Sequence, residues 1–234
     1  MYQEAINNYL KQHGHEKINL KAVLFDMDGV LFNSMPNHAS SWHKVMERMG
    51  FGLSEEEAYM HEGRTGADTI NIISRRERGC DATDEEIKAI YAAKSEEFNK
   101  CPEAPRMPGA WEVLNKIKDD GLTRMIVTGS GQVSLLDRLN KNFPGIFQKE
   151  LMVTAFDIKF GKPNPDPYLM ALEKGGLKPN EAIVIENAPL GVQAGVAAGI
   201  FTIAVNTGPL PDEVLWDAGA NLLFHSMPEF NENW

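Results

Sequence analysis

The hydrophobic pattern of the chain changes character along its length and separates a helical block from an alternating one. Between residues 36 and 100, apolar positions recur at helical spacing, and no stretch is typical of a strand. The last predicted helix opens on Thr83 and Glu86, which are spaced as a capping box. We interpret this block as a helical insert. Its predicted helices cover residues 38–49, 54–59, 65–78 and 83–100.

Beyond a segment with three prolines at residues 101–109, short apolar runs alternate with helical periodicity. Strands separated by helices of about 10 to 15 residues are typical of βαβ units and a parallel sheet. The predicted fold class is α/β, a Rossmann-like doubly wound parallel sheet core with an inserted α-helical cap domain. The predicted strands cover residues 22–25, 123–127, 151–154, 182–185 and 200–205, and the predicted helices cover 110–119, 132–141, 167–174 and 190–198.

Two linkers, at residues 33–36 and 101–109, mark where the chain leaves the α/β core and re-enters it. A helical block bounded in this way is expected to cover the core as a cap. The predicted domains are residues 1–19, a leading extension with a short helix over 2–13; residues 20–33 and 106–234, the α/β core; and residues 34–105, the helical cap.

Composition and charge limit the classes of partner. The chain has 234 residues, of which 43% are hydrophobic and 24% charged, and its formal net charge is −10. This negative charge argues against nucleic acid or an anionic membrane as a partner. No run approaches the ~18 apolar residues of a membrane span, and the N-terminus lacks the pattern of a signal peptide. We expect a cytoplasmic monomer in which Cys80 and Cys101 are free thiols.

Residues 21–34, KAVLFDMDGVLFNS, join a buried apolar run to two aspartates. Asp26 and Asp28 lie two residues apart just after the predicted strand, so both side chains point toward the working edge of a parallel sheet. Two carboxylates at that distance repel each other unless a cation or a proton lies between them, and Mg²⁺ suits such a pair. The pattern Asp-x-Asp-Gly is also compatible with a simple polar turn.

Polar residues also follow three other predicted strands. Parallel strands bring such loops to the same edge of the sheet. A hydroxyl, backbone amides that open a helix, an ammonium and carboxylates around a metal are the groups that phosphoryl transfer requires. The clusters are Thr128, Gly129 and Ser130 after the second strand, Lys162 after the third, and Glu186 and Asn187 after the fourth.

Taken in this order, the four clusters resemble the motifs of the haloacid dehalogenase (HAD) superfamily of phosphotransferases, over nearly the whole chain after the leading helix. The sequence is most similar to the subgroup with a helical cap after the first strand. That subgroup includes β-phosphoglucomutase, small phosphatases and a bacterial type of inorganic pyrophosphatase, which this sequence resembles most.

The resemblance implies a role for each matching residue. Asp26 would be the nucleophile that takes the phosphoryl group as an aspartyl phosphate, and Asp28 would be the general acid and then the general base. Thr128 would hydrogen-bond the phosphoryl oxygens, and Lys162 would neutralise Asp26 and the transferring phosphate. The implied cofactor is Mg²⁺, held by Asp26, the backbone carbonyl of Asp28, Glu186 and Asn187.

One departure from the family pattern concerns the metal. Asn187 stands where the family usually has an acidic residue, so one negative charge is missing beside the metal. Glu62, in the cap segment 61–65, is our candidate for a replacement ligand, because a loop there could dip into the site when the cap closes. A solvated loop position for Glu62 is an equally open alternative.

Two further departures concern the substrate. Gly66 stands where mutases of this subgroup have an arginine for a distal phosphate, and Arg64 directly follows the cap-loop glycine. Mutases also have Lys-Asn where this chain has Gly131 and Gln132. Both differences weaken the grip on a sugar bisphosphate and favour hydrolysis of a small substrate.

Other cap residues have two open interpretations. Lys94 lies where relatives often have a lysine that reaches the substrate, but a surface position is nearly as compatible with the sequence. His38 and Trp42 lie one turn apart and could line the site or pack the cap; we favour packing for Trp42 and leave His38 open. The candidate substrate-binding residues are Gly129, Ser130, Arg64, Thr65, Lys94 and His38.

The predicted function is that of a Mg²⁺-dependent phosphohydrolase with an aspartyl-phosphate intermediate, most specifically an inorganic pyrophosphatase or a small phosphate-ester phosphatase. Its partner would be pyrophosphate or a small phosphorylated substrate. One alternative is β-phosphoglucomutase, which shares the first half-reaction. A second alternative is a non-catalytic phosphate-binding or interaction protein, against which the complete set of motif residues argues.

Overall fold

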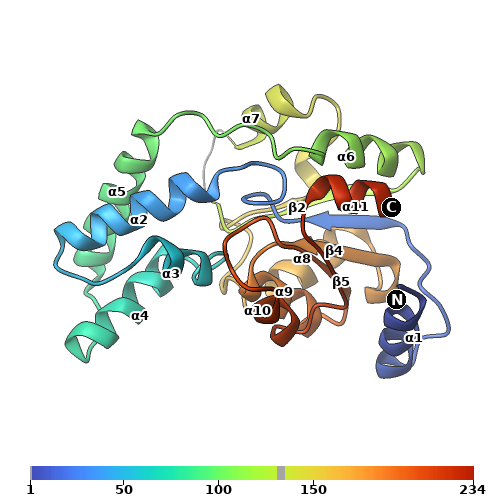
Figure 1. The fold of residues 1–234 in the computed structure, drawn as a ribbon, viewed down its shortest axis with the longest axis horizontal. Coiled ribbons are helices and arrows are strands. Elements are labelled where there is room, and N and C mark those ends of the chain that lie inside the picture. Colours follow the sequence, from blue (N-terminus) through green and yellow to red (C-terminus); the bar gives the residue numbers. More distant parts are fainter. Residues whose placement is uncertain (1, 131–134) are drawn as a thin grey trace.

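A parallel sheet of six strands forms the centre of the core, in the spatial order β3-β2-β1-β4-β5-β6 (Figure 1). The computed structural model describes residues 2–130 and 135–234. All neighbouring strands run parallel, as predicted. The strands are β1 (Ala22–Phe25), β2 (Thr123–Val127), β3 (Met152–Val153), β4 (Ala182–Glu186), β5 (Phe201–Val205) and β6 (Leu222–Phe224).

Helices cover both faces of this sheet. Val23 and Phe25 of β1 belong to the apolar cluster shared with α6, α7 and α11, whereas Ala22 and Leu24 belong to the cluster shared with α8 and α9. Because side chains alternate along a strand, one buried strand can serve both clusters. The doubly wound α/β fold is confirmed. The core helices are α1 (Tyr2–His13), α6 (Ala110–Asp119), α7 (Leu135–Asn142), α8 (Asp166–Gly175), α9 (Pro189–Ala197), α10 (Asp212–Asp217) and α11 (Met227–Asn233).

Four helices form the cap, which lies at the left of Figure 1 beyond the sheet. Val45, Met46, Ile70, Ile73 and Ile90 make a separate apolar cluster between them. The helix α4 ends at Gly79 in the left-handed conformation, and α5 begins with the predicted capping box. The cap helices are α2 (Met35–Arg48), α3 (Glu55–Met60), α4 (Gly66–Arg78) and α5 (Asp84–Lys100).

The two linkers between core and cap run side by side. The Asn33 amide donates to the Pro105 carbonyl over 3.0 Å, and the Met107 amide donates to the Leu31 carbonyl over 2.8 Å. Phe32 and Arg106 form an antiparallel bridge between these bonds. The proposed boundaries between core and cap therefore lie where two neighbouring peptide segments hold each other.

The structure also differs from the sequence predictions. The strand β6 and the helices α10 and α11 were not expected, because segments of three, six and seven residues carry too little periodicity to be recognised. The helix α2 begins at Met35 rather than at residue 38, since Pro36 fits the first turn of a helix. Residues 132–134 of the predicted helix 132–141 lie outside the described residues.

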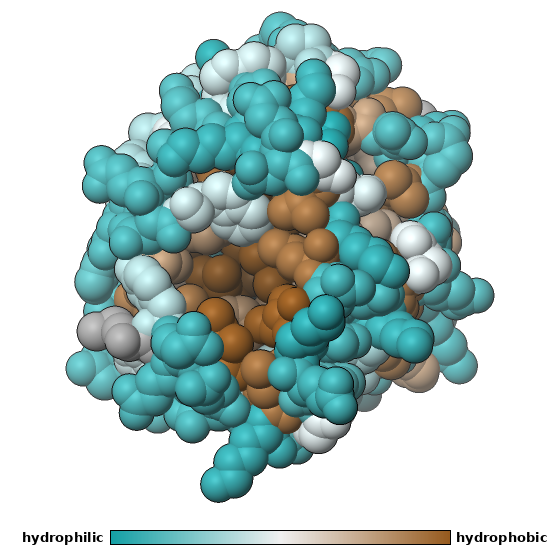
Figure 2. Space-filling model, turned by 90° about the vertical axis from the view of Figure 1, so that its right-hand side faces the viewer, coloured by the Kyte–Doolittle hydropathy of each residue, from teal (hydrophilic) through white to brown (hydrophobic). Residues whose placement is uncertain are grey.

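The leading helix α1 packs at the end of the core opposite the cap (Figure 1). Tyr9 is buried, donates its hydroxyl to the Gly199 carbonyl over 2.9 Å and meets the Phe201 ring edge-on. Figure 2 looks at this end of the molecule and shows apolar side chains gathered in a hollow. In the part of the chain described here, no helix is both long and apolar enough to span a bilayer, and Cys80 and Cys101 are free thiols.

Candidate active site

The chain turns sharply at the carboxyl end of β1 and places two aspartates there. Asp26 continues the ladder, its amide donating to the Ile185 carbonyl over 3.0 Å. Gly29 has φ +84°, and a Cβ at this position would overlap the Asn187 amide group. Glycine alone satisfies both the positive φ and the close approach. The glycine of the Asp-x-Asp-Gly pattern therefore lets the loop after β1 contact Asn187, which follows β4.

A buried ammonium connects the first, third and fourth motifs. Lys162 Nζ lies 2.5 Å from Asp26 Oδ1 and 2.6 Å from Glu186 Oε1, and it donates to the Val127 carbonyl over 3.1 Å. All three side chains are almost inaccessible to solvent. The strand ends that the sequence predicted at one edge of the sheet are therefore joined by two buried ion pairs.

Tyr168 completes this network, and the sequence reasoning missed it. Its hydroxyl donates to Glu186 Oε1 over 2.6 Å, while Glu186 Oε2 accepts from the backbone N–H of Asn187 over 3.2 Å. Both Glu186 oxygens are therefore engaged within the protein. The only sequence signal was an aromatic residue six positions after Lys162 at the start of a helix, which is no more than a core residue would show.

Burial and charge act in opposite directions on the pKa values here. Burial disfavours the Lys162 ammonium, but Asp26 and Glu186 outweigh this and raise the pKa of Lys162. Burial also raises the pKa of Asp26 to about 8 against the pull of Lys162, and Glu186 and Asp28 add to the rise. An additional positive charge would favour the ionised form of Asp26 that a nucleophile needs.

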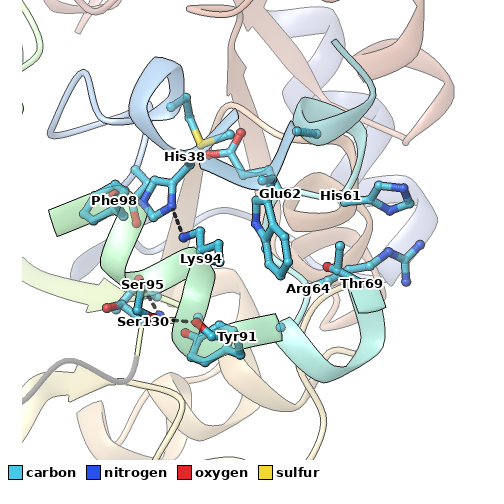
Figure 3. A pocket seen from close by; sticks show the side chains of 18 of the residues that line it. His38, His61, Glu62, Arg64, Thr69, Tyr91, Lys94, Ser95, Phe98 and Ser130 are labelled. Carbon is cyan, nitrogen blue, oxygen red and sulfur yellow. Dashed lines mark hydrogen bonds and ion pairs between the residues drawn. The ribbon is translucent and has the colours of Figure 1, made fainter. Parts of the chain in front are cut away.

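The cap reaches down to this network through the loop after α3. Glu62 follows that helix, and both of its oxygens accept from Asn187 Nδ2, over 3.1 Å and 3.0 Å. A Cβ on Gly63 would lie 3.0 Å from Lys162 Cδ, and one on Gly161 would lie 3.1 Å from Thr65 Cγ2. The loop after α3 thus lies against the core, and Glu62 lines the cavity together with Asp26 and Asp28 (Figure 3).

The surroundings of Glu62 and Asn187 fit a cation. Burial, and next the negative charge of Asp26, raise the pKa of Glu62 well above its ordinary value, despite the hydrogen bond from Asn187. Asn187 Oδ1 is buried and has no hydrogen-bond partner among the described residues. Those residues contain no cluster of three or more His, Cys, Asp or Glu arranged to hold a metal. A metal here would therefore need amide or backbone oxygen among its ligands, which Mg²⁺ accepts.

A second chain of contacts links Asp28 to the cap. Ser34 Oγ donates to Asp28 Oδ1 over 2.5 Å, and His38 Nε2 lies 3.5 Å from the same oxygen. Lys94 Nζ lies 2.7 Å from His38 Nδ1 (Figure 3). An ammonium can only donate, so Nδ1 accepts and the His38 proton lies on Nε2, on the side of Asp28.

Lys94 and His38 both face the site and are not surface residues. Lys94 is 6% exposed, and its ammonium lies 5.5 Å from the Trp42 ring centroid and 4.9 Å from that of Phe98. Burial, together with Lys94, lowers the pKa of His38, against the pull of Asp28. Burial disfavours ionisation of Asp28, but His38, Ser34 and the more distant Arg138 outweigh it and lower the pKa of Asp28.

Of the remaining predicted site residues, some line the cavity and one caps a helix of the cap. Thr128 Oγ1 accepts from the Ser130 amide over 3.1 Å, and this loop lines the cavity with Gly129. Arg64 lines it too, on the side away from His38 in Figure 3. Thr65 instead caps α4, since its hydroxyl accepts from the Asp68 amide, and its predicted substrate contact stays a prediction. Gly131 and Gln132 lie outside the described residues.

The cavity between core and cap is small. Its volume is about 120 Å³, and its lining includes Asp26, Asp28, Glu62 and Lys94. Sites for drug-sized ligands typically have about 300 to 1,000 Å³. Trp42, which we expected to pack the cap, lies against the cap cluster and also lines this cavity.

The buried ammonium of Lys94 is expected to make kcat/KM depend on pH. Burial lowers the pKa of Lys94 to about 8, so its charge is lost as the pH rises through this value. If the charged form receives the substrate, kcat/KM falls above about pH 8, whereas ionisation of Asp26 acts in the opposite direction. We expect Lys94→Met to lower kcat/KM by about 10- to 100-fold and to remove the alkaline fall.

Steady-state kinetics from pH 6 to 10 provide the measurement for this prediction. Lys88→Met is the matched control, because Lys88 is exposed on the same helix. An alkaline fall that persists unchanged in Lys94→Met would show that another group causes it.

Comparison with known proteins identifies the family of this chain. The model of the family described as haloacid dehalogenase-like hydrolase matches residues 23–205. The chain belongs to the haloacid dehalogenase-like hydrolase family. The predicted resemblance to its helical-cap subgroup is confirmed, and so is the prediction of a HAD-type phosphoryl-transfer enzyme.

Several relatives within this family are similar over most of their length. Hexitol phosphatase A of Escherichia coli is 34% identical, over 80% of this chain and 83% of the relative. Phosphorylated carbohydrates phosphatase of Thermotoga maritima is 29% identical, over 86% of this chain and 92% of the relative. A provisionally named beta-phosphoglucomutase from Bacteroides vulgatus is 80% identical over 100% of this chain and 95% of its own, with a TM-score of 0.97.

Proposed function

We propose that this HAD phosphohydrolase is a Mg²⁺-dependent inorganic pyrophosphatase. The observation that supports it most is the contact between Glu62 of the cap and Asn187 of the core. In this proposal the contact would bring a cap carboxylate to the metal and would leave less room beside Asp26 for a large substrate. A cytoplasmic location and a monomeric state stay predictions.

In this proposal the chain itself performs each step of the phosphoryl transfer. Asp26 Oδ attacks a phosphorus atom, the bond to the bridging oxygen breaks, and the phosphoryl group passes to Asp26. Asp28, oriented by Ser34, would take up a proton when the negative charge of the bound substrate raises its pKa. It passes this proton to the leaving phosphate and then accepts one from the water that hydrolyses the aspartyl phosphate. Lys162 offsets charge on Asp26 and the transferring group.

The metal would be held by Asp26, the backbone carbonyl of Asp28, Asn187 Oδ1 and Glu62. When bound, Mg²⁺ stabilises negative charge on the phosphoryl oxygens. Glu186, which the resemblance implied as a ligand, accepts from Lys162, Tyr168 and the Asn187 backbone amide. A carboxylate has more lone pairs than these bonds use, so Glu186 stays a predicted metal ligand and also holds Lys162 in place.

A second candidate is a phosphatase or mutase acting on a small sugar phosphate. The names of the relatives favour it, since Hexitol phosphatase A and the Bacteroides vulgatus protein are both named for such chemistry. None of the three relatives described above is named as a pyrophosphatase. Lys94 and Arg64 supply cationic groups that could bind a sugar phosphate as well.

Phosphate release by the purified protein with Mg²⁺ distinguishes the candidates. Pyrophosphate is compared with sorbitol 6-phosphate and glucose 6-phosphate, and conversion of β-glucose 1-phosphate is followed alongside. A kcat/KM for pyrophosphate that exceeds the others by about tenfold or more supports the proposal. Preference for a sugar phosphate supports the second candidate, and conversion to glucose 6-phosphate supports the mutase.

Glu62 gives a separate prediction about the metal. Removal of a carboxylate from the metal site should weaken Mg²⁺ binding, and we expect Glu62→Ala to raise the Mg²⁺ concentration for half-maximal activity by about tenfold or more. Glu56→Ala, at an exposed position of α3, is the matched control. An unchanged Mg²⁺ requirement with pyrophosphate would exclude Glu62 as a ligand.

A further inference from the structure

Tyr91 occupies the space that a side chain at Gly66 would need. The ring carbons Cδ2 and Cε2 lie so close to Gly66 that a Cβ there would overlap them. Unlike Gly29, Gly66 does not have a positive φ, so its backbone conformation does not demand glycine. The contact with the Tyr91 ring is therefore the physical reason that this position has no side chain.

The pair belongs to the wall of the substrate cavity. Tyr91 and Gly66 line the same cavity as Asp26 and Glu62, and the Tyr91 ring centroid lies 6.4 Å from that of Trp42. Tyr91 precedes Lys94 by three residues on α5, so the two side chains share one face of the helix (Figure 3). The aromatic ring thus lies on the same face of α5 as the buried ammonium, at the cap side of the site.

Packing of the cap does not account for Tyr91. Its neighbour Ile90 is buried in the cap cluster, whereas Tyr91 is 44% exposed and does not belong to that cluster. A large aromatic residue that is half exposed, lines the cavity and is accommodated by a glycine on another helix is better explained by the shape of the cavity than by the stability of the cap.

We propose that Tyr91, seated on Gly66, limits the size of the leaving group that the closed site accepts. This rests on the proposed phosphohydrolase activity, but it does not depend on pyrophosphate being the substrate. A leaving group no larger than phosphate or acetate fits in the part of the cavity that the Tyr91 ring leaves free, whereas a polyol chain collides with the ring. Tyr91 is a specificity-determining residue that takes no part in the bond-breaking step.

The test compares a small with a large leaving group in Tyr91→Ala. Acetyl phosphate and sorbitol 6-phosphate are the substrates, and the ratio of their kcat/KM values is the readout. We expect the ratio of sorbitol 6-phosphate to acetyl phosphate to rise at least about tenfold in Tyr91→Ala, a size of change that a pocket contact of this kind can produce. Tyr91→Phe, which keeps the ring, should leave the ratio unchanged.

A ratio within about twofold of the wild-type value in Tyr91→Ala would overturn the proposal, as would an equal rise in Tyr91→Phe. Loss of both activities in a folded Tyr91→Ala protein would overturn it too, because Tyr91 would then be needed for turnover itself. Tyr91→Ser provides an independent small variant. Failure of the pyrophosphate assay alone would reject the proposed pyrophosphatase and leave this ratio, which does not involve pyrophosphate, unaffected. A wild-type preference for sorbitol 6-phosphate over acetyl phosphate would overturn the Tyr91 proposal itself.

Discussion

Replacement of Asp26 by asparagine is expected to lower phosphate release by about 10⁴-fold or more, the scale seen when a catalytic nucleophile is removed. The amide has nearly the shape of the carboxylate but cannot form the aspartyl phosphate. Asp26 is buried against Lys162, and this contact can be kept in part by the amide oxygen. The protein should therefore stay folded while turnover is lost.

Steady-state phosphate release and circular dichroism of the purified variant measure both parts of this prediction. Asp217→Asn, at an exposed position of α10, is the matched control and should keep full activity. Sustained turnover by a pure Asp26→Asn preparation would remove Asp26 as the nucleophile.

Lys162→Met is expected to reduce both activity and stability. The ammonium is the positive partner of two buried carboxylates, Asp26 and Glu186. Loss of one partner of a buried ion pair typically costs about 3 to 5 kcal/mol in the free energy of unfolding, because the remaining charges stay uncompensated. Loss of a preorganised charge at the reacting group should lower kcat by about 10²- to 10³-fold.

Urea denaturation with and without Mg²⁺ gives the free energy of unfolding, and phosphate release gives kcat. Lys118→Met, on the exposed side of α6, is the control for the loss of a lysine. If Lys162→Met unfolds at the same urea concentration as the wild type, the ammonium does not carry the electrostatic role that its position suggests.

The sheet could be predicted from the sequence because its strands are marked by strong local signals. β1 and β4 are continuous apolar runs that end on charged residues, and their bounds agree with the prediction to within one residue. β6 could not be predicted, since three residues at an edge give no periodicity. Its place follows from pairing with β5, which is a contact between distant segments.

The candidate site was predictable in its motifs but not in its contacts. The departure at Asn187 suggested a compensating carboxylate, and the structure brings Glu62 to the Asn187 amide. The hydrogen bond of Tyr168 to Glu186 and the contact of Tyr91 with Gly66 gave no such signal. Each depends on the distance between side chains from separate helices and strands, which the order of residues along the chain does not contain.

The paired linkers have a consequence for how this molecule could diversify. Because the Asn33 amide is bonded to the Pro105 carbonyl, both ends of the cap meet the core at one point. An insertion with adjacent ends can be exchanged for a longer or shorter one without altering the host fold. The whole cap, with the residues that determine substrate specificity, can therefore be exchanged while the sheet and the loops that carry Asp26, Lys162 and Glu186 stay the same.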